Sequence, residues 1–123
     1  MGSIKHLLKE NSKYKISGTM WIECENERFF GPGRAELLQH IEATGSINKA
    51  AKAMKISYKK AWGMIAALNE QATKPMVISK TGGEEGGGSI ITNEAKELID
   101  FHKNLKDKFL SFLEKETNNM NQY

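Results

Sequence analysis

Four consecutive residues in the middle of the chain, Ser57, Tyr58, Lys59 and Lys60, have side chains suited to contacting a nucleic acid. Lysine can reach a phosphate or the O6 and N7 acceptors of guanine, and tyrosine can contact a phosphate or a thymine methyl group. Ser57 is a favourable N-cap, and the free N–H groups at a helix N-terminus attract phosphate. The segment therefore predicts a helix whose first turn could enter the major groove of DNA.

Positive charge is concentrated around this segment. Residues 34–80 contain eight Lys and Arg against Glu36, Glu42 and Glu70, a balance of 8 − 3 = +5, whereas the whole chain carries +3. Residues 94–116 contain five lysines and six acidic residues, a balance of −1. A surface that meets phosphates needs such an excess, although exposed lysines also occur on ordinary solvated helices.

Three helices are expected here, over residues 34–44, 47–54 and 58–71. Gly45 would end the first, Ser46 would cap the second, and Pro75 closes the third. The apolar residues available for packing in the second and third are Ile47, Ala50, Ala51, Met54, Ala61, Trp62, Ile65 and Leu68. Two short helices joined by a tight turn, with small alanines that permit a close crossing, predict a helix-turn-helix.

Residues at the start of the second helix could hold the domain on a sugar-phosphate backbone. Ser46, Asn48 and Lys49 occupy that position, and contacts of this kind orient a protein without reading base sequence. Capping alone is the alternative role for Ser46. For Trp62 we expect a place in the core rather than a base contact.

Short strands are expected on both sides of the helices. Residues 14–25 and 28–30 predict a β-hairpin, and residues 76–80 and 89–92 predict two strands joined by a glycine-rich turn, the arrangement of a wing. Lys80 and Thr81 at the base of the wing are candidate phosphate contacts. Glu84 and Glu85 at its tip would be repelled by phosphate, so wing contact with DNA stays open.

The last segment, residues 93–116, predicts a long helix with apolar residues spaced alternately by three and four. At 1.5 Å per residue it would extend about 36 Å, more than a domain of this size can cover. We therefore expect part of it to meet a second subunit, against the alternative that it packs only on its own core. The candidate dimerisation residues are Leu98, Leu105, Phe109 and Phe112.

Several function classes are disfavoured. The single Cys24 allows no intrachain disulfide, and the three histidines are too scattered for a local zinc site, so no metal or cofactor is expected. We find no catalytic constellation and expect no enzyme. No apolar run could span a bilayer and no signal peptide is evident, so no membrane contact and a cytoplasmic location are expected.

The order of several short motifs resembles a known family. These motifs are Gly45-Ser46-Ile47, Ala50-Ala51, Ile56-Ser57-Tyr58-Lys59, Ala61-Trp62, Thr81-Gly82-Gly83, Gly86-Gly87-Gly88 and Ile91-Thr92. Over about residues 14–115 the chain resembles the N-terminal DNA-binding domain of the molybdate-responsive transcriptional regulators of the ModE family, and more distantly the LysR-type regulators. The resemblance implies an α+β winged helix-turn-helix, with an N-terminal β-hairpin and a long C-terminal helix.

From the residues and this resemblance together we expect a flexible N-terminus (1–12), a DNA-binding domain with a C-terminal dimerisation helix (13–116) and a flexible tail (117–123). The expected partners are double-stranded DNA and a second copy of the chain. In that family molybdate is bound by additional C-terminal domains, so no molybdate site is expected in this chain. The alternatives are a winged-helix interaction module that dimerises and serves a separate ligand-sensing partner, and an oxyanion-binding protein.

Overall fold

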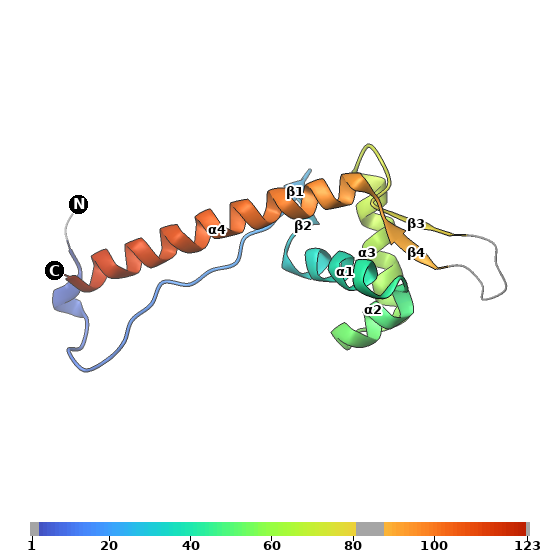
Figure 1. Ribbon diagram of the computed structural model, residues 1–123. Helices are drawn as coiled ribbons and strands as arrows, with labels where there is room; N and C mark the ends of the chain where they lie inside the picture. The colour runs from blue at the N-terminus through green and yellow to red at the C-terminus, as the bar shows by residue number, and fades with distance from the viewer. Residues whose placement is uncertain (1–2, 81–87, 123) are drawn as a thin grey trace. The chain divides into compact units, whose positions relative to one another are not determined.

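The computed structural model describes residues 3–80 and 88–122 (Figure 1). The chain divides into two compact units, one formed by residues 21–102 and the other by residues 1–20 together with 103–123. The longest helix, α4 (Asn93–Gln122), contributes residues to both units. The first unit contains the other described α-helices and strands. A short 3₁₀ turn at Lys5–Leu7 belongs to the second unit.

The first unit is an α+β winged helix-turn-helix, as the sequence predicts. A hairpin of β1 (Ile22–Cys24) and β2 (Glu27–Phe30) leads into three helices, α1 (Pro32–Thr44), α2 (Ile47–Met54) and α3 (Tyr58–Gln71). A second antiparallel pair, β3 (Val77–Ser79) and β4 (Ser89–Ile91), follows α3 and precedes α4. In Figure 1 the β3–β4 pair lies beside α3 and the chain between its strands is drawn in grey.

The first strand of the hairpin is much shorter than predicted. Residues 13–21 form no strand, and pairing with β2 begins only at Ile22. In the second unit the backbone of residues 14–16 is instead held by side chains of α4: Ile16 N donates to Thr117 Oγ1 at 3.0 Å, and Asn121 Nδ2 donates to the Tyr14 carbonyl at 3.2 Å. Helical partners replace the strand partner that the sequence pattern implied.

Helix ends differ from prediction in two places. The first helix begins at Pro32 rather than Arg34, because proline at the first helical position needs no hydrogen-bond partner for its nitrogen. Helix α4 continues beyond the predicted end near Glu116 to Gln122, so residues 117–122 are helical where the sequence predicted a flexible tail. The predicted end at Gly45 is confirmed by its left-handed conformation, with φ of 69°.

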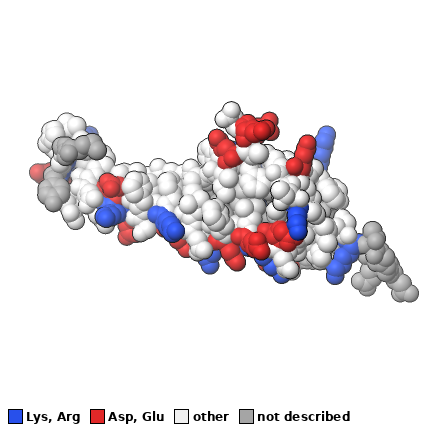
Figure 2. Space-filling view, turned by 90° about the horizontal axis from the view of Figure 1, so that it is seen from above, with Lys and Arg blue, Asp and Glu red and all other residues white. Residues whose placement is uncertain are grey.

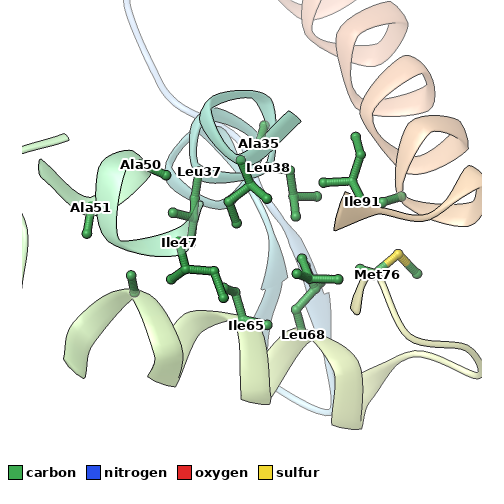
Figure 3. Close-up of a cluster of buried hydrophobic side chains, with 14 of the residues drawn as sticks. Ala35, Leu37, Leu38, Ile47, Ala50, Ala51, Ile65, Leu68, Met76 and Ile91 are labelled. Atoms are coloured by element: carbon green, nitrogen blue, oxygen red, sulfur yellow. The ribbon is translucent and has the colours of Figure 1, made fainter. Parts of the chain in front are cut away.

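The core of the first unit lies between α1, α2 and α3, with contributions from the wing strands (Figure 3). Leu37, Leu38 and Ile41 of α1 face the completely buried alanines of α2 and the apolar side of α3. Ala50, Ala51 and Ala61 are each at most 1% exposed, so these predicted packing residues of α2 and α3 do lie in the core. Leu98 and Ala95 bring the start of α4 against the same core.

The wing strands are fixed to the helices by two sets of polar contacts. Asn69 of α3 accepts hydrogen bonds from the N–H groups of Met76 (2.7 Å) and Val77 (3.4 Å) and donates one to the Val77 carbonyl (3.2 Å). On the other strand, Ser89 N donates to the Gly45 carbonyl at 2.9 Å. A Cβ on Gly88 would lie 2.9 Å from that same oxygen, so only glycine fits there.

The hairpin is fixed by Arg34 of α1. Its Nη1 donates to the carbonyls of Arg28 (3.0 Å) and Phe29 (2.6 Å) and to Gln71 Oε1 at 2.9 Å. Partial burial lowers the pKa of the Arg34 guanidinium, which nevertheless stays charged at neutral pH. One arginine therefore joins the hairpin, α1 and the end of α3.

Replacement of Asn69 by alanine tests the anchor between α3 and the wing. Asn69→Ala removes all three hydrogen bonds and leaves partly buried backbone groups without partners, so the free energy of unfolding should fall by about 1–3 kcal/mol in urea titrations. The exposed Asn104→Ala serves as control and should change it by less than about 0.5 kcal/mol. Equal stability of the two variants would contradict the anchoring role.

Candidate nucleic-acid interface

The first turn of α3 is presented to solvent. Ser57 Oγ accepts a hydrogen bond from Lys60 N at 3.0 Å, which confirms the predicted N-cap. Tyr58, Lys59 and Lys60 are all exposed, whereas Ala61 directly after them is completely buried. Ser57 thus fixes the start of α3, and three of the predicted contact residues lie exposed on its first turn.

The start of α2 has the same construction. Ser46 Oγ accepts from Lys49 N at 3.1 Å, and Asn48 and Lys49 are exposed on the first turn. Ser46 itself is half-buried, so its hydroxyl serves the helix end first. The adjacent N–H groups at this end remain favourable for an anion.

The turn between α2 and α3 contains a lysine that is not among the predicted contact residues. Lys55 is exposed and adopts a left-handed conformation, with φ of 58°. Its N–H donates to the Lys52 carbonyl at 3.1 Å, and Ile56 N donates to the Ala51 carbonyl at 3.0 Å, which closes the C-terminus of α2. The signal for it was available, because a charged residue between two predicted helices must lie in the exposed turn.

The surface of α2 and the first turns of α3 has one sign of charge. No Asp or Glu lies between Glu42 and Glu70, whereas five lysines do: Lys49, Lys52, Lys55, Lys59 and Lys60. All five are exposed. The face of the molecule in Figure 2, in contrast, carries basic and acidic side chains interspersed. The helix-turn-helix is therefore the part of the chain suited to a polyanion.

Trp62 does not lie in the core, so that expectation was wrong. Its side chain is 39% exposed, and its ring meets that of Tyr58 edge to face with centroids 6.2 Å apart. The reason is the helical phase: Ala61, Ile65 and Leu68 define the buried side of α3, and Trp62, one turn after Tyr58, lies on the flank of that side, about 100° around the helix from Ala61. Two large aromatic rings are thus exposed beside Lys59.

The predicted wing contacts are only partly covered by the structure. Lys80 is exposed, and its N–H donates to the Gly88 carbonyl at 2.7 Å, which extends the β3–β4 pairing by one step. Thr81, Glu84 and Glu85 lie outside the described residues. Contact between the wing and DNA therefore stays a prediction.

The predicted dimerisation residues fall in both units of the chain. Leu98 is partly buried and packs on the core of the first unit. In the second unit Leu105 and Phe109 are partly buried, Phe109 lying close to Gly18, and Phe112 is 57% exposed. The arrangement leaves apolar side chains of α4 uncovered, and dimerisation itself stays a prediction.

Other kinds of site have little support. Within residues 3–80 and 88–122, no cluster of His, Cys, Asp and Glu has the arrangement of a metal site. Cys24 is half-buried on β1. Among the described helices, none is long and apolar enough to cross a membrane.

No family model matches the chain, but curated proteins are similar to it. It is 40% identical to the transcriptional regulator ModE of Haemophilus influenzae over 81 residues, which are 66% of this chain and 32% of that protein. It is 37% identical to the DNA-binding transcriptional dual regulator ModE of Escherichia coli K12 over 81 residues, 66% of this chain and 31% of the relative. The chain contains a ModE-family N-terminal domain.

A further ModE-family relative has a name that refers to molybdenum. The molybdenum transport protein ModE of Azotobacter vinelandii is 36% identical over 89 residues, which are 72% of this chain and 33% of that protein. The chain thus spans about a third of the length of the curated relatives it matches.

The N-cap of α3 in this ModE-family domain can be tested by stability alone. Ser57→Ala should lower the free energy of unfolding by about 1 kcal/mol, because the N–H of Lys60 loses its acceptor. Ser57→Asp should restore it, since aspartate caps equally well and its charge suits the helix dipole. Thermal and urea unfolding measure both. An alanine variant as stable as the wild type would show that the cap contributes nothing.

Proposed function

We propose that this chain binds double-stranded DNA in a sequence-specific manner and regulates transcription, with α3 as the helix that enters the major groove. The observation that carries the proposal is the exposed surface of α2 and the first turns of α3, which has five lysines and no carboxylate. Two capped helix N-termini open onto this surface. The names of the ModE-family relatives, which are transcriptional regulators, support the same function.

Within this proposal the residues have different tasks. Lys59 and Lys60 contact phosphate or the acceptor edge of guanine, and Tyr58 contacts phosphate or a thymine methyl group, from the exposed first turn that Ser57 caps. Ser46, Asn48 and Lys49 hold the sugar-phosphate backbone and orient the domain without reading sequence. Lys55, in the turn between the helices, adds a phosphate contact.

The wing would add contacts beside the groove. Lys80 is exposed at the end of β3, one step beyond the last pair of the two strands, and Thr81 follows it in the sequence. We assign both to phosphate. Asn69 holds β3 on α3, so a duplex bound along α3 would find Lys80 at a fixed offset from that helix.

We further propose that the chain acts as a homodimer through α4. Leu98, Leu105 and Phe112 follow one another at seven-residue intervals, and Phe109 widens the stripe they form. Phe112 is more than half exposed, as is Phe101 next to the stripe. Exposed phenylalanines on one side of a helix favour coverage by a partner, and a two-fold dimer would present two α3 helices to a pair of half-sites.

The regulated genes are proposed to belong to molybdenum metabolism. This rests on the name of one relative, the molybdenum transport protein ModE of Azotobacter vinelandii. Selection of bound sequences from random DNA, followed by a search for half-sites about one helical turn or its multiples apart, would define the operator.

Salt dependence tests the phosphate contacts directly. The wild-type affinity for a selected duplex should fall steeply with salt, and Lys59→Ala with Lys60→Ala should reduce the slope of log K against log salt by about 1–2. The control is Lys103→Ala with Lys106→Ala, which removes the same charge from α4 and should leave the slope unchanged. Fluorescence anisotropy at several salt concentrations measures both.

The outcomes separate the candidate functions. Unchanged affinity in the α3 double variant would contradict its assignment as the DNA-contacting helix. A wild-type chain with no affinity for any duplex would remove the proposed function and leave the interaction module as the better reading.

Sedimentation equilibrium tests the dimer. At tens of micromolar the wild type should sediment as a dimer, and Phe112→Glu should shift it towards monomer because a carboxylate would be buried in an apolar interface. Ser111→Glu is the control, since it adds the same charge at the neighbouring exposed position. A monomeric wild type would contradict the role of Leu98, Leu105, Phe109 and Phe112.

A further inference from the structure

The chain has two tryptophans of nearly equal exposure, and their surroundings differ. Trp21 is 38% exposed, but Arg28 lies over its ring with Cζ 4.0 Å from the centroid, and its indole N–H donates to Glu23 at 3.0 Å. Two residues of the hairpin thus contact Trp21: Arg28 covers its ring and Glu23 accepts the hydrogen bond of its indole N–H.

Trp62 has no comparable partners. Its only ring contact among the described residues is the edge-to-face contact with Tyr58, and none of those residues accepts a hydrogen bond from its indole N–H. The position next to it, Gly63, is open: a Cβ there would meet no atom within 4 Å apart from its chain neighbours and the backbone of its own helix. An aromatic face and an N–H donor are therefore both available on the outer side of α3.

The charge around Trp62 indicates what could cover it. Lys59 lies on the same exposed side of α3, and the nearest acidic residue along the helix is Glu70 in its last turn. A polyanion complements this surface, whereas a second copy of the same lysine-bearing surface would repel it. The occupant we infer is the DNA duplex of the proposed function.

The chemistry of the major groove narrows the contact to one base. The faces of the bases are stacked inside a duplex, so an indole in the groove meets base edges only. Thymine is the base that presents an apolar C5 methyl group next to an acceptor, O4. An indole supplies the matching pair, an apolar ring and one N–H donor. Cytosine presents a donor at the corresponding place, which an indole cannot accept.

We propose that Trp62 is a specificity-determining residue that packs on a thymine methyl group in the major groove, with Tyr58 holding its ring in place. The inference rests on the proposed function and deepens it: the lysines give affinity that depends on salt, and Trp62 gives base preference that does not. Trp62→Ala should therefore weaken binding to a selected duplex about tenfold while leaving the salt slope unchanged.

The test combines a protein variant with a DNA variant. In a duplex selected from random DNA, each thymine is replaced in turn by deoxyuridine, which lacks only the methyl group. At one or more positions the wild type should lose about fourfold in affinity, the value for burying one methyl group. Trp62→Ala should be insensitive to that replacement. Trp21→Ala, the matched control, should keep the wild-type sensitivity.

A second measurement guards against a variant that merely misfolds. In Trp21→Phe the indole of Trp62 is the sole tryptophan reporter, and its emission should change on addition of the selected duplex. Trp62→Phe should fold like the wild type by circular dichroism and keep part of the methyl sensitivity, because phenylalanine retains an apolar ring but lacks the N–H donor.

The outcomes distinguish this inference from the proposed function. If the wild type binds the duplex with steep salt dependence but Trp62→Ala retains full affinity or full sensitivity to deoxyuridine, the role of Trp62 is wrong and DNA binding stands. If Trp62 emission responds to protein concentration and not to DNA, the ring belongs to a protein interface and the inference fails. If no duplex is bound, both fail together.

Discussion

The side-chain amide of Asn69 determines where the wing stands relative to α3. It binds the backbone of Met76 and Val77 on both its donor and its acceptor side, so β3 begins at a fixed place beside the last turns of the helix. The returning strand is held at its other edge by the hydrogen bond from Ser89 N to the Gly45 carbonyl. Because Gly45 also ends α1 and precedes the cap of α2, the wing, the turn and the two helices of the helix-turn-helix share one set of contacts.

Helix caps and helix phase together explain how the candidate surface arises. Serines at positions 46 and 57 begin α2 and α3, and the buried residues Ala61, Ile65 and Leu68 rotate α3 so that Tyr58, Lys59 and Trp62 face outward. The positive charge of this surface comes from its exposed lysines and also from the absence of carboxylates between Glu42 and Glu70. The positive charge of this surface and the outward orientation of its side chains therefore have separate origins in the sequence.

Local signals made much of the fold predictable, and contacts between distant residues account for the rest. Capping serines, Gly45 and the apolar period of α3 are recognised within a few residues, which is why α2 and α3 have the predicted bounds and Ser57 the predicted capping role. The shortness of β1 was not predictable in this way. Its cause is a distant residue, because the N–H of Ile16 donates to Thr117 on α4 and not to a neighbouring strand. Trp62 was wrongly predicted to be buried because large apolar residues are usually found in the core. Whether it is buried depends on its angular position around the helix axis, which differs from that of the neighbouring Ala61. The anchoring role of Asn69 has no local signal at all.

Lys55 has a consequence for how the turn between α2 and α3 tolerates change. The left-handed backbone at Lys55 lowers the free energy of unfolding by about 1 kcal/mol relative to glycine at the same position. The turn is therefore less stable than it could be, but it carries a positive charge. Natural variation at this position should then be limited to two kinds of residue. Glycine or asparagine would relieve the backbone, lysine or arginine would preserve the charge, and a β-branched residue would satisfy neither demand.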